Sequence, residues 1–362
     1  QAPYFCREVR ALPMSMQQAQ TSGISSSFVD VFDHWASLLP THIAICGSGV
    51  SWTWEELCQK SHLAQKHIIA ECRAAKKCGR AIEVVAILAH RSPWWLAATL
   101  GVMRCKLPFV WMGAGELPAK GRYAERQRND HIMQLLHPEL LLLDSAAAPE
   151  AIPDWQQMEK PRTLALEALQ ADVCEDIEAV PLNTDMSDLP ALCYQLTGGT
   201  TGSSKCVRVS HEMALHEFEA YAKVFKDLSS KDRVLQHTPV LWAASAIGQI
   251  NIAVSVGASI CIAGMDQDSI SRHGVTILGT VPSALQSINP QAVPTVRHVF
   301  CWGESMSPVL RAQWKSGQRR VIELLISTEY WLSLYSEGQI SPEGRPIYSC
   351  VPGAELAVLQ DG

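Results

Sequence analysis

The sequence predicts an α/β protein whose sheets are mostly parallel and covered by helices on both faces. Short apolar runs alternate with segments of helical periodicity, and strands that are buried on both faces have this composition. With 362 residues, the chain is long enough for two or three packed units. The segments predicted as strands are 84–89, 140–143, 191–197, 234–238, 259–263, 275–280, 299–302 and 321–326, with helices over 94–104 and 212–225.

Composition and turn residues predict the remaining segments of the chain. An arm or linker rich in glutamine, serine and methionine (1–27) precedes a helix (28–40), a hairpin turning at glycines (43–53) and a long helix (54–75). The acidic, proline-containing stretch 146–188 is interpreted as a surface excursion between units.

Composition restricts the class of protein. The chain is 47% apolar and 18% charged, which is typical of a soluble globular protein, and its net charge of −6 disfavours nucleic acid as a partner. No apolar segment is long enough to cross a membrane, and the first residues lack the order of a signal peptide. The twelve cysteines show no metal-binding spacing and indicate free thiols in a reducing, cytoplasmic compartment. The chain is interpreted as a piece of a longer polypeptide.

A glycine-rich loop at 197–205 carries the chemistry. It holds three glycines, three threonines, two serines and Lys205, directly after an apolar strand. Glycines allow backbone N–H groups to approach a ligand, and together with hydroxyls these groups form a concavity that suits an anion. The spacing is not that of a Walker A loop, because Lys205 follows Gly202 by three residues. On composition alone, a flexible loop with an incidental lysine is the alternative.

The run Leu-Thr-Gly-Gly-Thr-Thr-Gly-Ser-Ser-Lys resembles the signature of the adenylate-forming superfamily, which includes acyl-CoA synthetases, peptide-synthetase adenylation domains and luciferases. The family pattern is S/T-S/T-G-T-T-G-x-P-K-G. Departures from it are Gly198, Ser204 and Cys206. The matching positions are Thr197, Gly199, Thr200, Thr201, Gly202 and Lys205.

Further segments resemble family motifs in the same order along the chain. The run 205–211 is most similar to the β-alanine-activating, peptide-synthetase-like subgroup. The other segments are 28–75, 104–111, 207–211, 275–283, 299–307, 325–329 and 344–347.

The resemblance implies a large N-terminal lobe over 28–340, made of two αβα sandwich subdomains with mostly parallel sheets. One subdomain would span roughly 80–210, and the other roughly 28–79 with 211–340. Residues 341–362 would begin a third, β-rich subdomain, a small β-barrel. The mobile C-terminal lobe of the family would be absent, so the fragment itself is expected to be inactive or weakly active.

The resemblance also implies the reaction of an acid–thiol ligase. ATP and a carboxylic acid would give an acyl-adenylate and pyrophosphate, and the acyl group would then pass to CoA or to a phosphopantetheine carrier domain. Thr200, Thr201 and Lys205 would act on the phosphates, where negative charge develops. Thr328 would lie beside the α-phosphate, and Glu329 would help to hold Mg²⁺.

Nucleotide and acid pockets are implied at further positions. Thr197, Gly199 and Gly202 in the loop, and Gly303 and Glu304 on the adenine side, would bind the nucleotide. Leu325 takes the position of an aromatic residue that stacks on the base.

The acid pocket is expected within 241–249, at Trp242, Ala243, Ala244 and Gly248. No aspartate is available there to hold an ammonium group, which disfavours an α-amino acid bound in the usual way. Trp242 as a pocket wall would favour an apolar or aryl acid. Plain core packing is the alternative for Trp242.

A non-catalytic function is the alternative to the ligase. A degenerate relative that binds or scaffolds without catalysis is favoured by Leu325, Ile326, Ser204 and Cys206. The ligase is favoured by the larger set Thr200, Thr201, Gly202, Lys205, Glu304, Thr328 and Glu329.

Overall fold

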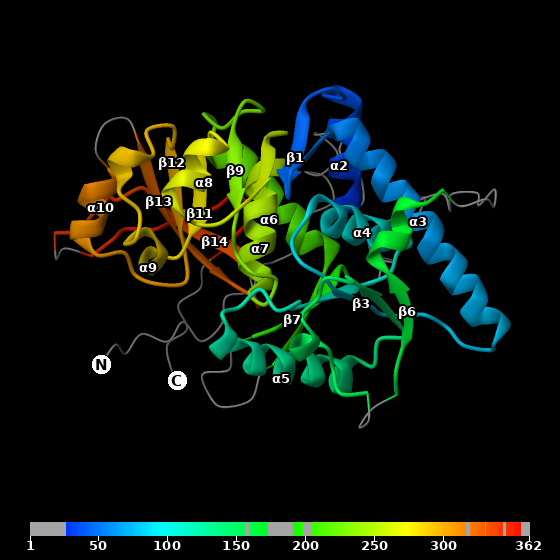
Figure 1. Ribbon diagram of the computed structural model, residues 1–362. Coiled ribbons are helices and arrows are strands. Elements are labelled where there is room, and N and C mark those ends of the chain that lie inside the picture. The colour runs from blue at the N-terminus through cyan, green and yellow to red at the C-terminus, as the bar shows by residue number, and fades with distance from the viewer. Residues whose placement is uncertain are drawn as a thin grey trace.

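Two twisted sheets and the helices that flank them make up the computed structural model (Figure 1). The six-stranded sheet has the order β6-β5-β3-β4-β7-β8, and only its last pair, β7 with β8, is antiparallel. Its strands are β3 (Val85–Leu88), β4 (Phe109–Met112), β5 (Leu140–Leu143), β6 (Arg162–Ala165), β7 (Cys193–Leu196) and β8 (Cys206–Val209). The structure describes residues 27–155, 159–172, 191–197, 205–315, 319–329, 331–342 and 345–355.

The nine-stranded sheet has the order β15-β14-β13-β12-β11-β9-β10-β1-β2 and is parallel in its centre. Antiparallel pairs stand only at its two ends, where the hairpin of β1 and β2 closes one end and β13, β14 and β15 close the other. Its strands are β1 (Ile43–Gly47), β2 (Val50–Thr53), β9 (Arg233–Gln236), β10 (Ser259–Ile262), β11 (Ile277–Thr280), β12 (His298–Cys301), β13 (Arg320–Ser327), β14 (Trp331–Ser336) and β15 (Ser349–Cys350).

The helices begin where local sequence satisfies their first N–H groups. In α3 the Thr53 hydroxyl accepts from the Glu56 N–H, and the Glu56 carboxylate accepts from the Thr53 N–H, which is a capping box. The α-helices are α2 (Phe28–Leu38), α3 (Trp54–Lys77), α4 (Pro93–Arg104), α5 (Ala119–Leu136), α6 (His211–Val224), α7 (Ala243–Val254), α8 (Gln267–Arg272), α9 (Pro282–Leu285) and α10 (Pro308–Trp314). Short 3₁₀ turns are η1 (Pro149–Ala151), η2 (Leu166–Gln170) and η4 (Pro290–Ala292).

Helix α7 joins the two sheets. It packs against β9, β10 and β11 of the large sheet and against β7 of the small one. Its sequence is apolar over most of its surface, and every residue from Ala246 to Val254 is buried, as expected for a helix covered on all sides. The main buried core therefore runs without interruption from one sheet to the other, through residues such as Ile87 and Ile260.

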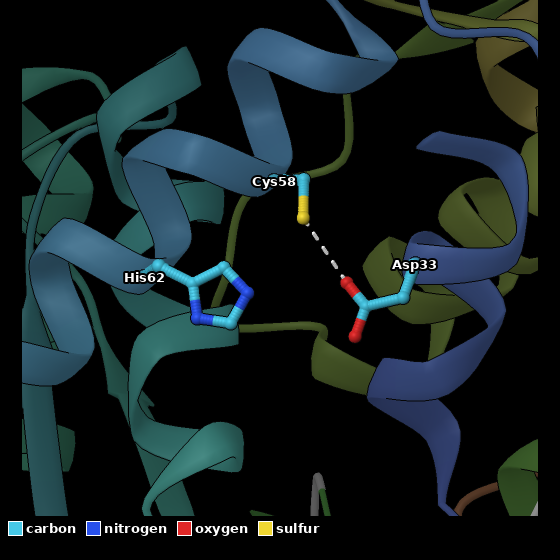
Figure 2. A group of neighbouring side chains, drawn as sticks. All are labelled: Asp33, Cys58 and His62. Atoms are coloured by element: carbon cyan, nitrogen blue, oxygen red, sulfur yellow. Dashed lines mark hydrogen bonds between the residues drawn. The ribbon is translucent and has the colours of Figure 1, made fainter. Parts of the chain in front are cut away.

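A polar cluster fixes α2 against α3 and α4 (Figure 2). The Cys58 thiol points at the Asp33 carboxylate, with Sγ 3.2 Å from Oδ1, and His62 lies beside them one turn along α3. Arg104, at the end of α4, is buried to 1% exposure and holds both carboxylate oxygens of Asp33. The Ser61 hydroxyl accepts a further bond from Arg104 Nε at 2.8 Å.

The donor set of this cluster suits a transition metal, but Arg104 already occupies the carboxylate. Burial raises the pKa of the Cys58 thiol to about 11, and the neighbouring Asp33 charge adds to this rise. Burial lowers the pKa of His62, with Arg104 adding to the effect. A thiol, a neutral imidazole and an ion-paired carboxylate make a structural contact between helices rather than a metal centre.

The predicted α/β class with mostly parallel sheets is confirmed. The predicted strands and the helices over 28–40, 54–75, 94–104 and 212–225 are present with small shifts of their ends. One interpretation differs: within 146–188, β6 joins the small sheet in parallel register with β5, so this stretch is not only a surface excursion. Helix α5 escaped prediction because its sequence, AKGRYAERQRNDHIMQLL, is mostly polar.

The end of the described chain adds an antiparallel strand to the large sheet. Strand β15 pairs with β14 at Tyr335 and Ser349, and a single bridge joins Ile340 to Pro346. No closed barrel is present among the described residues. Within those same residues, no helix has the length and apolar character that a membrane crossing requires.

Candidate functional site

A cavity of about 1150 Å³ opens at the carboxyl ends of five parallel-sheet strands. Its walls come from the last residues of β7, β11 and β13, from the residues directly after β9 and β12, from α5, and from the first turn of α7. Ligands of open α/β sheets bind outside the carboxyl ends of strands, and this cavity has the volume of a small-molecule site. It is therefore the candidate site.

Six of the predicted site residues line this cavity: Trp242, Ala243, Ala244, Gly303, Glu304 and Thr328. They come from three different strands or helices, so the fold gathers positions that are up to 86 residues apart in the sequence. The Trp242 side chain is 56% exposed, which excludes plain core packing for it. Ala243 and Ala244 follow it on the first turn of α7 and present only methyl groups.

The adenine-side prediction falls on a tight turn after β12. Gly303 has φ +78°, a left-handed conformation that glycine adopts without strain. The next residue, Glu304, reaches across to the turn after β11, where its carboxylate accepts from the Ser283 N–H at 2.9 Å and from the Ser283 hydroxyl at 2.8 Å. These bonds hold two strand ends together at the edge of the cavity.

Other predicted residues lie near the cavity without lining it. Leu325 is 36% exposed on β13 and pairs with Leu334, and its neighbour Ile326 lines the cavity instead. Glu329 is exposed in the turn after β13, and its N–H donates to the Ser327 hydroxyl. Gly248 is buried on α7, where an added Cβ would lie 3.4 Å from Oε1 of Glu217.

The glycine loop is described only at its two ends. The Thr197 N–H donates to the Lys205 carbonyl at 2.8 Å, and the Lys205 N–H donates to the Thr197 hydroxyl at 3.3 Å. The loop is thus closed at its base, and the Lys205 side chain is exposed. Gly199, Thr200, Thr201 and Gly202 lie outside the described residues.

Sequence reasoning missed a chain of polar groups at the inner end of the cavity. The Trp302 indole N–H donates to the Ser245 hydroxyl at 2.8 Å, and that hydroxyl lies 3.2 Å from the hydroxyl of Thr238. The Gln249 amide then donates to the Thr238 hydroxyl and to the Gly279 carbonyl. Ser245 and Gln249 fall within 241–249, the segment predicted for the acid pocket, so their polar character was a visible signal.

Two buried histidines are neutral near pH 7. Burial lowers the pKa of His237 to about 4, and its Nε2 lies 3.2 Å from the Gly279 carbonyl. Burial likewise lowers the pKa of His211 to about 4, and its Nδ1 accepts from the Phe28 N–H. His211 lies at the start of α6 and acts in packing, whereas His237 is part of the cavity wall.

The Trp302 ring lies over Gly279 so closely that no other side chain fits there. A Cβ at position 279 would overlap Cη2 of Trp302 and lie 2.9 Å from Cζ3. Gly279→Ala is expected to push the ring into the cavity and to lower the free energy of unfolding by about 1–3 kcal/mol. Chemical denaturation, followed by tryptophan fluorescence, checks both effects. Ser287→Ala, which removes an exposed hydroxyl bonded to the Ala284 carbonyl, is the control. An unchanged Gly279→Ala protein would contradict the packing described.

The model of the AMP-binding enzyme family matches residues 32–362. The chain belongs to this family. The predicted membership of the adenylate-forming superfamily is thereby confirmed.

Relatives of this AMP-binding chain include fungal nonribosomal peptide synthetases. It is 23% identical over 369 residues to nonribosomal peptide synthetase sirP of Leptosphaeria maculans, covering 98% of this chain and 16% of that protein. It is also 23% identical over 296 residues to nonribosomal peptide synthetase 8 of Aspergillus fumigatus, covering 78% of this chain and 3% of that protein. The chain thus spans a small part of the length of these relatives.

A solved structure shows the same fold. The N-terminal subdomain of Klebsiella oxytoca NpsA matches with a TM-score of 0.70 at 18% identity, covering 91% of this chain and 81% of that one.

Proposed function

We propose that this AMP-binding chain supplies the nucleotide- and acid-binding lobe of an ATP-dependent ligase. The reaction is the conversion of a carboxylic acid and ATP to an acyl-adenylate and pyrophosphate. The observation that carries the proposal is that one cavity brings Gly303, Glu304 and Thr328 together with Trp242 and Ala243. The first three residues suit the nucleotide, and the last two suit the acid.

Two side chains in the cavity wall carry buried polar atoms that have no hydrogen-bond partner among the described residues. The Thr280 hydroxyl and Oε1 of Gln195 belong to side chains exposed by 1% and 2%, and neither atom has a hydrogen-bond partner among the described residues. Both residues line the cavity. Because an unpaired buried polar atom is costly, a nucleotide or acid that bonds to these atoms would be favoured. A solved structure of FmoA3, a nonribosomal peptide synthetase, is an AMPPNP-bound form.

The phosphates would lie against the loop that Thr197 and Lys205 close. Thr200, Thr201 and the Lys205 ammonium would stabilise the negative charge that develops as pyrophosphate leaves. Magnesium, when bound, neutralises phosphate charge, and the exposed carboxylate of Glu329 is an oxygen ligand of the kind it prefers. The Thr328 hydroxyl would donate a hydrogen bond to the α-phosphate.

An apolar or aryl acid fits the pocket wall best. The first turn of α7 offers the Trp242 ring and two methyl groups, and no carboxylate to hold an ammonium. The Klebsiella oxytoca NpsA subdomain has been solved with 3-hydroxybenzoyl-AMSN. The similarity to peptide synthetases supports transfer of the acyl group to a phosphopantetheine carrier domain, with CoA as the alternative acceptor.

Pyrophosphate exchange into ATP tests the proposal on the natural protein that carries this chain. We expect exchange with aryl or branched aliphatic acids at rates above those with α-amino acids. A protein that binds no ATP and supports no exchange with any acid would refute the proposal.

Thr328→Val is expected to lower the exchange rate by about ten- to a hundredfold, because one preorganised donor to the phosphate is lost. The matched control is Thr163→Val on β6, the outer strand of the other sheet, where the hydroxyl bonds only to the Pro161 carbonyl. Equal rates for the two variants would exclude a role for Thr328 at the phosphate.

A binding or scaffold module without catalysis is the second candidate. It is favoured by Ile326, which lines the cavity where the family has glycine, and by Leu325, which is not among the residues that line it. ATP binding without exchange for any acid would favour this candidate.

A further inference from the structure

One arginine side chain joins two walls of the cavity through a single nitrogen. Arg128 lies on α5 and lines the cavity. Its Nη2 donates to the Leu196 carbonyl at 2.6 Å and to the Leu241 carbonyl at 2.8 Å. These two carbonyls are 45 residues apart in the sequence and belong to different layers of the fold.

Each carbonyl stands directly before a segment of the proposed active site. Leu196 ends β7, and the next residue, Thr197, closes the base of the glycine loop through its bond to Lys205. Leu241 precedes Trp242, whose carbonyl accepts the first bond of α7, from the Ala246 N–H at 3.0 Å. Nη2 of Arg128 therefore connects the start of the glycine loop to the start of α7 and fixes the distance between them.

The charge on Arg128 has no carboxylate in salt-bridge contact among the described residues. Burial lowers the pKa of its guanidinium, and no neighbouring charge contributes to that shift. Its hydrogen bonds to the Leu196 and Leu241 carbonyls instead connect two segments of the cavity wall.

We propose that Arg128 is a positioning residue of the adenylation site, which sets the base of the loop 197–205 relative to the first turn of α7. The inference rests on the proposed function, because the two segments would hold the phosphates and the acid. In adenylation, a carboxylate oxygen must attack the α-phosphorus in line with the departing pyrophosphate. Small errors in the separation of the two segments then lower the rate of the chemical step more than the affinity for either substrate.

The first test measures the contact itself by amide hydrogen exchange. Arg128→Met is expected to increase exchange about tenfold at the Thr197 and Ala246 amides. Arg126→Met is the matched control on the same helix, because Arg126 is ion-paired at the surface with Asp130 and Asp154. Unchanged exchange at both amides of a folded Arg128→Met protein would overturn the proposal, whatever reaction the site catalyses.

The second test measures pyrophosphate exchange in the natural protein that carries this chain. Arg128→Met is expected to lower kcat about ten- to a hundredfold, with KM for ATP and acid changed by less than about threefold. Added guanidinium ion, at concentrations below those that unfold the protein, is expected to restore part of the rate of Arg128→Ala. Arg126→Met should retain the wild-type rate.

The outcomes separate this inference from the proposed function. Wild-type protein with no exchange activity refutes the proposed function, and with it the role of Arg128 in adenylation. Wild-type activity that is equal in Arg128→Met overturns the positioning role alone. A variant with lower activity, a lower Tm and no response to guanidinium also overturns it, because that result is expected of a packing residue.

Discussion

Replacing Glu217 by glutamine is expected to remove a loss of stability that the wild-type protein shows as pH rises from about 4.5 to about 8. Glu217 lies on α6 facing α7, is 1% exposed, and lies near Tyr221 and Asn251. Burial raises the pKa of its carboxyl to about 8, and the Asn251 and Tyr221 side chains only partly oppose the rise. The carboxyl is therefore protonated in the folded protein at neutral pH.

The direction of this pH dependence follows from the protonation of Glu217 in the folded and the unfolded protein. Below pH 4.5 the group is neutral in both, and stability is unaffected. Between pH 4.5 and 8 the unfolded chain releases the proton that the folded chain keeps, so the free energy of unfolding falls as pH rises. The total fall is of the order of 5 kcal/mol, since the pKa rises from 4.5 to about 8 and each pKa unit corresponds to about 1.4 kcal/mol.

Urea denaturation at a series of pH values measures this dependence. Glu217→Gln should be about as stable as wild type at pH 4.5 and clearly more stable at pH 8. Glu219→Gln is the control, because that carboxylate lies on the same helix and is paired with Lys223 near the surface. Parallel pH profiles for wild type and Glu217→Gln would show that the buried carboxyl does not titrate as described.

Asp33→Asn is expected to lower the free energy of unfolding by about 2–4 kcal/mol, because it leaves the buried Arg104 guanidinium without its anion. Burial raises the pKa of Asp33, but the bonds from Arg104 outweigh burial, and the pKa lies below its usual value. The stability that the ion pair contributes is therefore present above pH 4 and is lost as pH falls through the lowered pKa.

Thermal and urea denaturation at pH 7 give the size of the effect. The control is Asp154→Asn, which breaks a pair with Arg126 whose two side chains are about one-third exposed, and which should cost less than about 1 kcal/mol. If both variants lost the same stability, the burial of Arg104 would have no energetic consequence, contrary to this prediction.

Much of the fold could be predicted because its strands are short apolar runs with turn residues on either side. β3, β9, β10, β11 and β12 are all of this kind, and all were predicted. The exceptions have physical causes. Helix α5 is polar because much of its surface faces solvent, and β6 alternates in burial at the sheet edge, so neither has a strong apolar signal.

The parts of the site that could be predicted are those in which the functional residues lie together in one short run of sequence. Gly303, Glu304 and Thr328 follow strands in recognisable runs, and the structure brings them to one cavity. Arg128 could not be predicted in the same way, because its role arises from two carbonyls that are distant in sequence. Ile326 lines the cavity and Leu325 does not. The pairing of β13 with β14 shifts register between these two residues, and the sequence does not reveal that shift.

The place of β1 in the large sheet has a consequence for the order of folding during synthesis. β1 pairs in parallel with β10, at Ile45 with Ile260 and Cys46 with Cys261. The hairpin of β1 and β2 can therefore join the large sheet only after more than 200 later residues have left the ribosome, which takes roughly 10–40 s at ordinary rates of translation. The small sheet, by contrast, is complete by Val209, so it can form first and offer its helices as a surface on which the large sheet assembles.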